Sequence, residues 1–341
     1  MDSGINVAVV GATGAVGEAM ISVLEDSALP IRKLQPMSSE RSAGQTVTFR
    51  GDSVDVIATT PDAFEGIDAA LFSAGTAVSQ ALGRSLAEQG ITVIDNSRAF
   101  RMESDVPLVV PEVNPEAIAP ADHLIANPNC STIQLVVALE AARKVAPLHR
   151  VVTSTYQSAS GGGRAAMDEL RDQTVDLLNF RSPKVEHFSR RLAFDALPQI
   201  DAFAEDGFTL EEHKMINETR KILTLPDLAV CATCVRVPVF VGHALSVNIE
   251  FESAFDMSAL TEALSNQAGL EFRADPADFP TAADASGVDD VFVGRVRRDP
   301  SVPHGVVMWV VADNLRKGAA TNAVQILEHL YAQGRWSDVS K

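Results

Sequence analysis

The chain reads Ile5-Asn6-Val7-Ala8-Val9-Val10 and continues directly into Gly11-Ala12-Thr13-Gly14-Ala15-Val16-Gly17. The first six residues are almost all apolar, as expected of a strand buried on both faces of a parallel sheet. Apolar residues then recur at helical spacing from Glu18 to Glu25. Glycines between a strand and a helix permit a tight turn and bring backbone N–H groups to a pyrophosphate. Their spacing, G-x-x-G-x-x-G, departs from the common G-x-G-x-x-G, but this context predicts a dinucleotide site.

The segments that follow continue the alternation of strand and helix. Apolar runs over 31–34, 68–72 and 91–94 are predicted strands, and residues 77–89 are a predicted helix that ends at a glycine. This alternation is typical of an α/β, Rossmann-like sheet whose ligand lies beyond the carboxyl ends of the strands. Ser73 and Gly75 follow one of these strands and are small enough to let a cofactor approach the backbone.

A polar cluster after the second predicted strand bears on the choice of cofactor. Ser38, Ser39 and Arg41 combine hydroxyl groups with a guanidinium, which suits a phosphate. In an NAD site an acidic residue holds the ribose 2′-OH, whereas an arginine accommodates the 2′-phosphate of NADP. We therefore expect NADP, although Glu40 is an acidic residue in the same place and Arg41 could be a solvated loop residue.

The composition indicates a globular enzyme with two domains. The chain has 341 residues, of which 46% are apolar and 21% charged, and one hydrophobic core rarely serves so long a chain. The formal charge of −17 disfavours nucleic acids and anionic membranes as partners. The sequence shows neither a signal peptide nor an apolar run near the roughly 20 residues of a membrane span, so we expect a cytoplasmic protein.

The three cysteines indicate a reducing compartment and include one candidate nucleophile. Cys231 and Cys234 form a lone C-x-x-C in a valine- and alanine-rich run, which predicts a buried strand and no metal. Cys130 follows Asn127-Pro128, which imposes a turn or extended backbone, and precedes a helical pattern from Ser131. Because the start of a helix lowers a thiol pKa, Cys130 is predicted to be a reactive thiolate, with a small buried hydrophobe as the alternative.

The second half of the chain supplies partners for such a thiolate. Alternating residues over 151–156 predict an antiparallel strand, and the glycine run 161–163 predicts a loop that approaches another group closely. A strand is also predicted over 230–241. Strict alternation would place Arg236 and His243 on opposite faces, unless a bend at the intervening proline and glycine lets them converge. Imidazole is the usual proton partner of a catalytic thiol.

Other charged residues allow two interpretations. Arg98 and Arg101 suit an anionic substrate, or they form surface ion pairs with nearby carboxylates. Glu211 and Lys214 share one face of a predicted helix, as site residues or as an ordinary salt bridge. Apolar runs over 244–252 and 305–312 are predicted strands, and 319–332 is a predicted C-terminal helix that packs on the first domain. The segment 176–199 shows no clear period.

Together these motifs resemble the aspartate-β-semialdehyde dehydrogenase family. The resemblance extends in order over nearly the whole chain. It rests on Gly11–Gly17, Asp95–Ser97 with Phe100-Arg101, Val110–Asn114, Asn127–Thr132, Gln157–Gly161, Glu211–Met215, Arg236–Val239 with Gly242-His243, and Asp313–Gly318. Ala244 departs from the family pattern, in which a small hydroxyl residue follows the histidine.

The resemblance implies an architecture and a reaction. An NADP-binding domain over 1–128, completed by 315–341, would accompany a central α+β domain over 129–314 that forms the active site and the homodimer interface. The implied reaction is the reversible, NADP-dependent conversion of L-aspartyl-4-phosphate into L-aspartate-4-semialdehyde and phosphate. It would proceed through a cysteine thioester and serve lysine, threonine and methionine biosynthesis.

The resemblance also implies a role for each site residue. Cys130 would be the nucleophile, His243 the acid/base, and Gln157 would position the thiol and the intermediate. Arg236 would bind the substrate α-carboxylate and Glu211 its ammonium group. The remaining substrate contacts would be Arg101, Asn129 and Lys214, and the cofactor contacts would be Gly11, Thr13, Gly14, Ala15, Val16, Ser38, Ser39, Arg41, Ser73, Gly75, Ser160, Gly161 and Asn314.

Two alternatives remain open from the sequence. N-acetyl-γ-glutamyl-phosphate reductase has the same general architecture and thiol chemistry, but its substrate lacks the ammonium group that Glu211 would bind. A catalytically inactive relative that only senses a nucleotide would be expected to lack Cys130 or His243, and both are present.

Overall fold

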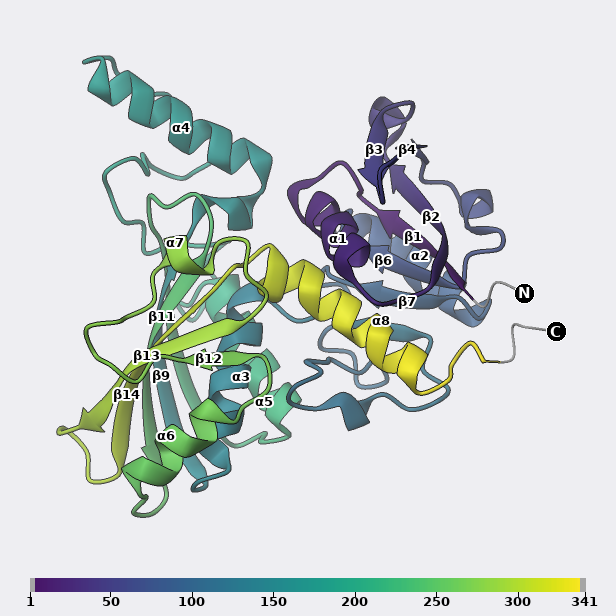
Figure 1. Ribbon diagram of the computed structural model, residues 1–341. Helices are drawn as coiled ribbons and strands as arrows, with labels where there is room; N and C mark the ends of the chain where they lie inside the picture. Colours follow the sequence, from purple (N-terminus) through teal and green to yellow (C-terminus); the bar gives the residue numbers. More distant parts are fainter. Residues whose placement is uncertain (1–3, 338–341) are drawn as a thin grey trace. The chain divides into compact units, whose positions relative to one another are not determined.

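The structure is a computed structural model and describes residues 4–337 (Figure 1). The chain divides into two compact units. The first unit comprises the chain up to Asn129 together with the segment from Ala319 onward, and the second unit is Cys130–Gly318. The second unit therefore begins at the cysteine that the sequence singles out.

A six-stranded parallel sheet forms the centre of the first unit. Its strands are β1 (Ile5–Val10), β2 (Ile31–Ser38), β5 (Ile57–Ala58), β6 (Ala69–Phe72), β7 (Thr92–Asp95) and β8 (Leu124–Ala126). The strand order is β5-β2-β1-β6-β7-β8, and every neighbouring pair is parallel. The order reverses between β1 and β6, where ligands bind in such sheets. The predicted Rossmann-like sheet is confirmed.

The glycine turn shapes the entry into the first helix. Gly11 has φ 89°, and a Cβ there would lie 2.8 Å from the backbone of Ser73, so the position requires glycine. Gly14 N–H donates to Gly11 O at 3.0 Å and precedes the helix. The remaining elements of this unit are α1 (Ala15–Asp26), α2 (Thr76–Glu88), α8 (Asn322–Ala332), the hairpin β3 (Thr46–Phe49) and β4 (Asp52–Asp55), and the turns η1 (Glu40–Ser42), η2 (Pro61–Phe64) and η3 (Pro115–Ala117).

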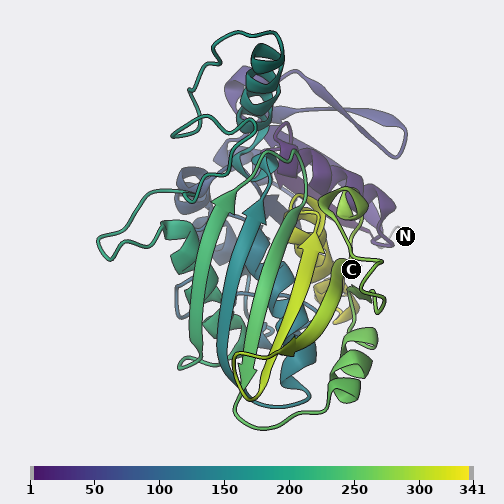
Figure 2. The same ribbon diagram turned by 90° about the vertical axis from the view of Figure 1, so that its left-hand side faces the viewer.

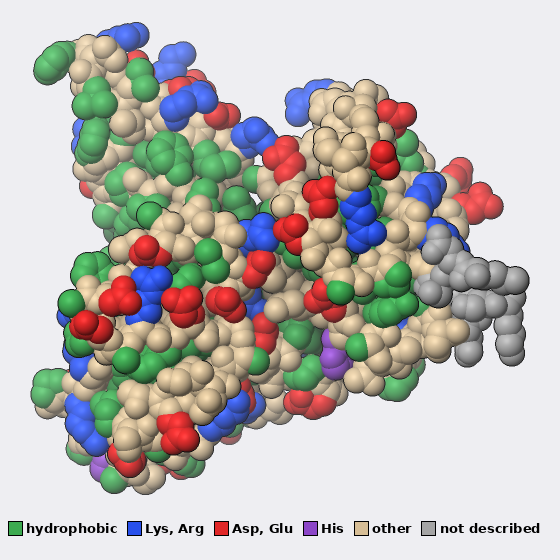
Figure 3. Space-filling model, in the orientation of Figure 1, with side chains coloured by type: hydrophobic (Ala, Val, Ile, Leu, Met, Phe, Trp, Pro, Cys, Tyr) green, Lys and Arg blue, Asp and Glu red, His purple; other side chains and the backbone are tan. Residues whose placement is uncertain are grey.

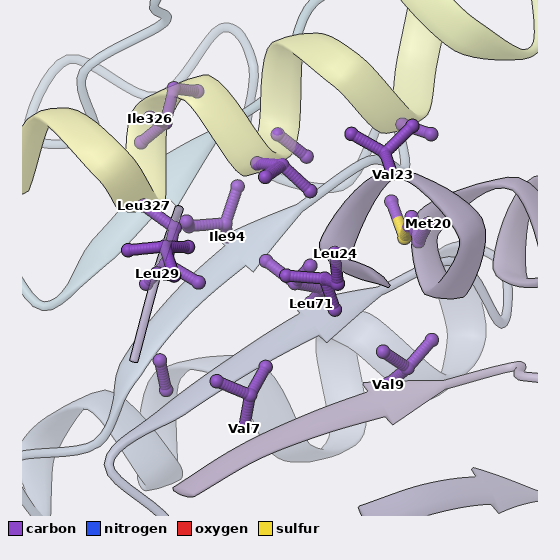
Figure 4. Packing of buried hydrophobic residues seen from close by; sticks show 14 of the residues in the cluster. Val7, Val9, Met20, Val23, Leu24, Leu29, Leu71, Ile94, Ile326 and Leu327 are labelled. Atoms are coloured by element: carbon purple, nitrogen blue, oxygen red, sulfur yellow. The ribbon is translucent and has the colours of Figure 1, made fainter. Parts of the chain in front are cut away.

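The C-terminal helix α8 belongs to the core of the first unit, as Figure 4 shows. Ile326 and Leu327 pack in one buried cluster with Leu24 of α1, Leu71 of β6 and Ile94 of β7. The helix starts later than its apolar pattern indicated, because a short π-helical turn, η5 (Arg316–Thr321), precedes it.

Strand β2 is longer than the sequence indicated. The predicted strand ended at Leu34, but β2 continues through Pro36 to Ser38. Proline lacks the N–H that a central strand needs. Because β5 pairs only with Met37 and Ser38, β2 has a neighbour on one side alone at Pro36.

A mixed six-stranded sheet forms the second unit, seen face-on in Figure 2. In the order β10-β9-β11-β14-β13-β12, its strands are β10 (Ala229–Arg236), β9 (Leu148–Gln157), β11 (His243–Phe251), β14 (Gly305–Ala312), β13 (Val291–Asp299) and β12 (Leu270–Phe272). Helices α3 (Cys130–Arg143), α5 (Leu210–Leu223) and α6 (Met257–Ser265) pack against this sheet, and α3 lies behind it in Figure 2. The unit also contains α4 (Arg164–Leu178), α7 (Ala282–Ala285) and η4 (Ala159–Gly162).

Two sequence predictions in this unit need correction. The predicted strand over 230–241 is confirmed as far as Arg236, but its end is wrong, because β10 stops there and the chain forms a loop before β11 starts at His243. Pro238 lacks a backbone donor and Gly242 has φ 92°, so neither continues a regular strand. Strand β9 was expected in an antiparallel sheet, but it is antiparallel only to β11 and parallel to β10.

The surface of the described residues shows mixed charge. Figure 3 shows acidic and basic side chains intermingled on the visible face of each unit, and hydrophobic side chains gathered over α4. Helix α4 ends at Leu178 and therefore includes the first residues of the segment 176–199, to which the sequence assigned no structure. Among residues 4–337, no helix combines the length and the apolar character needed to cross a bilayer.

We predict that Leu327→Ala lowers the free energy of unfolding by roughly 2–5 kcal/mol, because it removes a fully buried side chain from the core shared by α8 and the sheet. Denaturant titration followed by circular dichroism measures the change. Gln80→Ala, at an exposed position of α2, is the control and should alter stability by less than about 0.5 kcal/mol. Wild-type stability in Leu327→Ala would contradict the role of α8 in this core.

Candidate active site

Cys130 is the first residue of α3 and is half-buried, which confirms its predicted place at a helix start. Ser131–Ala142 are all buried, so the helix is held on every side. The first-turn N–H groups have no intrahelical acceptor, and the positive end of the helix dipole favours an anion there. Gly318 packs against the cysteine, and a Cβ at this glycine would lie 2.9 Å from Cys130 Cβ. The local structure therefore suits a thiolate in a fixed position.

Gln157 ends β9 and connects the sheet to α5. Its Oε1 accepts a hydrogen bond from Thr155 Oγ1 at 2.9 Å, and its Nε2 donates to Glu211 Oε1 at 3.1 Å. Lys214 Nζ lies 3.0 Å from Glu211 Oε2 and 2.9 Å from Asp201 Oδ2. Although burial opposes its charge, these two carboxylates raise the pKa of Lys214. Glu211 and Lys214 therefore form the salt bridge that the sequence left as an alternative, and the amide of Gln157 donates to the same carboxylate.

His243 begins β11 and is fully buried. Its Nδ1 accepts a hydrogen bond from the backbone N–H of Ser158 at 3.0 Å and lies 3.1 Å from Ser158 Oγ. Burial, assisted by the positive charge of Arg236, lowers the pKa of His243 to about 3. The imidazole is therefore neutral at physiological pH.

Arg236 ends β10, and its buried guanidinium donates from Nη1 to the carbonyl oxygen of Ser158 at 2.7 Å. Burial lowers its pKa, while the charges of Glu211 and Cys130 raise it. These two groups are thus close enough to act electrostatically on the guanidinium. A Cβ at Gly161 would lie 2.9 Å from Arg236 Nη1 and 3.2 Å from His243 Nε2, so a larger residue would displace one of them.

The sheet order brings Arg236 and His243 together. Strands β10 and β11 flank β9, with Arg236 opposite Gln157 and Ala244 opposite Tyr156. The end of β10 and the start of β11 therefore meet at the end of β9. The two side chains converge, as the sequence allowed, but they do so from separate strands rather than through a bend in one strand.

Asn314 connects the loops around this point. Its Oδ1 accepts hydrogen bonds from Ser158 Oγ and Ser160 Oγ, both at 3.0 Å, and from Gly242 N–H at 2.9 Å. The sequence singled out Ser160 and Asn314 as cofactor contacts, and the structure places both in the second unit. It did not single out Ser158, because alternation along a strand indicates which face a side chain occupies and not which bonds its backbone makes.

A cavity of about 710 Å³ lies in the first unit, beyond the carboxyl ends of β1, β2 and β6. Hydroxyl groups and backbone dominate its polar lining, and Ser42 and Thr59 belong to it although the sequence did not single them out. Its lining includes the predicted cofactor contacts Gly11, Thr13, Gly14, Ser38, Ser39, Arg41 and Ser73.

The cavity fits a dinucleotide that carries an additional phosphate. Thr13 Oγ1 lies 2.8 Å from Ser38 Oγ, which places two hydroxyl groups side by side in a cavity that Arg41 also lines. Glu40, the residue that would favour NAD, does not line the cavity. The predicted contacts Ala15, Val16 and Gly75 do not line it either. Ala15 and Val16 open α1, where backbone N–H groups face an anion, and Gly75 caps α2.

The other predicted substrate contacts, Arg101 and Asn129, are buried in the first unit. Arg101 Nη2 donates to Asn96 O at 2.8 Å. Arg98 is exposed, and the acidic residues that follow it form salt bridges with Arg84. Burial of a guanidinium directly after β7 is consistent with a structural or anion-binding role for Arg101.

The C-x-x-C pair does not form a site. Cys231 is exposed and Cys234 is buried, because residues three apart on a strand point to opposite faces. The strand is therefore buried on one face only. In the part of the chain that the structure describes, no three His, Cys, Asp or Glu side chains are grouped to hold a metal ion.

Comparisons with known proteins agree with this geometry. Two family models match, the NAD binding domain of semialdehyde dehydrogenases over residues 6–121 and their dimerisation domain over 139–317. The aspartate-semialdehyde dehydrogenase of Bacillus subtilis is 48% identical, over 97% of this chain and 98% of its own length. Aspartate-semialdehyde dehydrogenase 2 of Vibrio cholerae is 49% identical, over 97% and 98%.

Solved structures give the same result. The Vibrio cholerae aspartate semialdehyde dehydrogenase II complexed with ASA is 48% identical, with a TM-score of 0.94 over 96% of this chain and 98% of that one. The Candida albicans aspartate semialdehyde dehydrogenase with NADP is 25% identical, with a TM-score of 0.78 over 97% and 99%. Both units of the protein thus match one enzyme family over nearly their full length, and the chain belongs to the aspartate-semialdehyde dehydrogenase family.

Proposed function

We propose that this chain catalyses the reversible, NADP-dependent reductive dephosphorylation of L-aspartyl-4-phosphate to L-aspartate-4-semialdehyde, a step toward lysine, threonine and methionine. One observation carries the proposal: Gln157, Arg236 and His243 meet at one end of β9, in the same unit as Cys130 at the start of α3. This combination provides a nucleophile, an anion-binding cation and a group for the reacting oxygen within one unit.

Cys130 forms the covalent intermediate. In the phosphorylating direction its thiolate adds to the aldehyde carbon, and the carbonyl oxygen takes the negative charge. The nicotinamide of NADP, when bound, accepts the hydride whose loss leaves a thioester on Cys130. A phosphate oxygen then attacks the thioester, which releases aspartyl phosphate, one proton and the thiolate. Backbone N–H groups at the start of α3, from Cys130 or Ser131, help to stabilise the oxyanion.

The charged groups recognise the two ends of the substrate. The guanidinium of Arg236 suits the α-carboxylate, which it can bind through two hydrogen bonds. Glu211 binds the α-ammonium group, because an ionised carboxylate only accepts hydrogen bonds and an ammonium group only donates them. An N-acetylated substrate has no ammonium group for this carboxylate to bind. Arg101 and Lys214 bind phosphate or the acyl phosphate, and Asn129 is a further substrate contact.

Each of the two units has its own role in the proposed reaction. The first unit holds NADP in the cavity beyond β1 and β6, with the 2′-phosphate against Ser38, Ser39 and Arg41. The second unit performs the chemistry and forms a homodimer. Its sheet offers an apolar hollow of about 540 Å³ that includes the partly exposed Tyr156 and Phe279, a suitable surface for a second copy. A cytoplasmic location follows from the reducing conditions that a catalytic thiolate requires.

Replacement of the nucleophile tests the covalent mechanism. We predict that Cys130→Ser lowers phosphate-dependent NADPH formation from aspartate semialdehyde by at least about 10³-fold, because a serine hydroxyl is not ionised at neutral pH. Cys231→Ser makes the same chemical change at an exposed cysteine and should keep activity within about twofold. Undiminished turnover in Cys130→Ser, measured by absorbance of NADPH, would require a different mechanism.

Replacement of Arg41 tests the cofactor assignment. We predict that Arg41→Ala raises KM for NADP about tenfold or more and leaves KM for NAD unchanged, because the guanidinium contacts only the 2′-phosphate. Lys33→Ala, which removes an exposed cation of β2, is the matched control and should change neither constant. Equal losses for NADP and NAD in Arg41→Ala would contradict the proposed contact.

A further inference from the structure

We propose that Thr155 is a positioning residue for the reaction: its hydroxyl fixes the orientation of the Gln157 side-chain amide, and this amide in turn holds the Glu211 carboxylate in place. The inference rests on the proposed function, in which Gln157 positions the intermediate and Glu211 binds the α-ammonium group. Nothing in the sequence singled out Thr155, because threonine is common in strands of every function.

Four hydrogen bonds connect the backbone of β10 to Lys214 through these side chains. The N–H of Val235 donates to Thr155 Oγ1 at 3.3 Å, and this hydroxyl donates to Gln157 Oε1 at 2.9 Å. Gln157 Nε2 donates to Glu211 Oε1 at 3.1 Å, and Lys214 Nζ donates to Glu211 Oε2 at 3.0 Å. All of these residues belong to the second unit, and donors reach the carboxylate from two sides.

Only one direction of donation satisfies all of these groups. The ammonium of Lys214 can only donate, and the carboxylate of Glu211 only accepts. The nitrogen of the Gln157 amide must therefore face Glu211, and its oxygen must face Thr155. A flipped amide would place its oxygen against the carboxylate, where two acceptors repel each other. Because Thr155 Oγ1 accepts from the N–H of Val235, the hydroxyl keeps its own hydrogen for Gln157.

The sulfur of Cys234 offers a competing acceptor for this hydroxyl. Burial raises the pKa of the Cys234 thiol, and a hydrogen bond from Thr155 opposes that rise. A thiol sulfur accepts only weakly, whereas an amide oxygen accepts strongly. The thiol also has a partner of its own in Met215 Sδ, at 3.6 Å. The stronger acceptor, Gln157 Oε1, therefore sets the direction of the Thr155 hydroxyl.

Burial makes the loss of this hydroxyl costly. Thr155, Gln157 and Glu211 are all buried. A buried amide oxygen without a donor is unfavourable, because it has lost its contact with water as well. Without the Thr155 hydroxyl, the Gln157 amide loses the bond that anchors it on the side away from Glu211. The positions of the amide and of the carboxylate then both become less defined.

A neighbouring threonine shows that this face of β9 does not itself require a hydroxyl. Thr153 lies two residues before Thr155, so its side chain points to the same face of the strand, and it is also buried. Among residues 4–337, Thr153 Oγ1 has no hydrogen-bond partner. Two buried threonines on one strand face thus differ in hydrogen bonding, which makes Thr153 a matched control.

Separate removal of the hydroxyl and of the methyl group distinguishes orientation from packing. Thr155→Val keeps the shape of the side chain and removes the hydroxyl, whereas Thr155→Ser keeps the hydroxyl and removes the methyl group. We expect Thr155→Val to raise KM for aspartate semialdehyde about tenfold and to leave KM for NADP unchanged, because a bond that positions Glu211 is lost. Thr155→Ser and Thr153→Val should keep both constants within about threefold of wild type. Wild-type constants in Thr155→Val, or an equal rise in Thr155→Ser, would overturn the proposal.

NMR of the amide gives a readout that does not depend on activity. In protein labelled with ¹⁵N-glutamine, the side-chain amide of Gln157 is the signal missing from Gln157→Met. In wild type its hydrogens should exchange with solvent at least about 10²-fold more slowly than those of an exposed glutamine. The exchange should be about tenfold faster in Thr155→Val than in Thr153→Val.

Two NMR results would contradict the proposed role of Thr155. One is equal exchange in the two valine variants. The other is exchange in wild type at the rate of an exposed glutamine, which needs no variant that folds. Failure of the wild type to reduce NADP with aspartate semialdehyde would refute the proposed function instead, and leave the NMR result intact.

Discussion

The peptide backbone of Ser158 joins the two groups that face the substrate. Its N–H donates to His243 Nδ1 and its carbonyl oxygen accepts from Arg236 Nη1. Both side chains are buried, and each hydrogen bond to Ser158 offsets part of the cost of burying a polar group. Ser158, which lies between β9 and η4, thereby holds both a guanidinium and an imidazole through hydrogen bonds to its own backbone.

The sheet makes this arrangement possible. Because β10 and β11 flank β9, the last residue of one and the first residue of the other reach the same end of the central strand. This end of the sheet holds the positive charge of the buried Arg236, and the Glu211 carboxylate offsets it by raising the pKa of the guanidinium. Glu211 also forms a salt bridge with Lys214 and accepts a hydrogen bond from Gln157. Burial, together with the positive charge of Arg236, lowers the pKa of His243 and leaves the imidazole neutral. Substrate recognition and the state of the imidazole thus have a common electrostatic origin.

The sequence predicts the parts of this protein whose structure is decided locally. The strand at Ile5–Val10, its glycine turn and the helix at Cys130 follow from apolar period, glycine conformation and a proline-imposed turn. Where contacts between neighbouring strands decide the structure, the prediction from the sequence was wrong or was not made. It ended β2 before Pro36, because only the pairing shows that this proline faces no second strand. The sequence also predicted that β10 continues into the loop before His243, and it did not single out Ser158. Strand register and backbone hydrogen bonds across a sheet are tertiary properties, which local sequence does not determine.

The central claim is that the Cys130 sulfur carries the acyl group, and trapping that acyl group tests it most directly. Protein mixed with aspartate semialdehyde and NADP in the absence of phosphate should form about one NADPH per site and stop, since nothing cleaves the thioester rapidly. Mass spectrometry of the digested protein should then find one aspartyl group on the peptide that contains Cys130, removed on addition of phosphate. An unmodified Cys130 peptide after that burst, or an acyl group on another residue, would contradict the account.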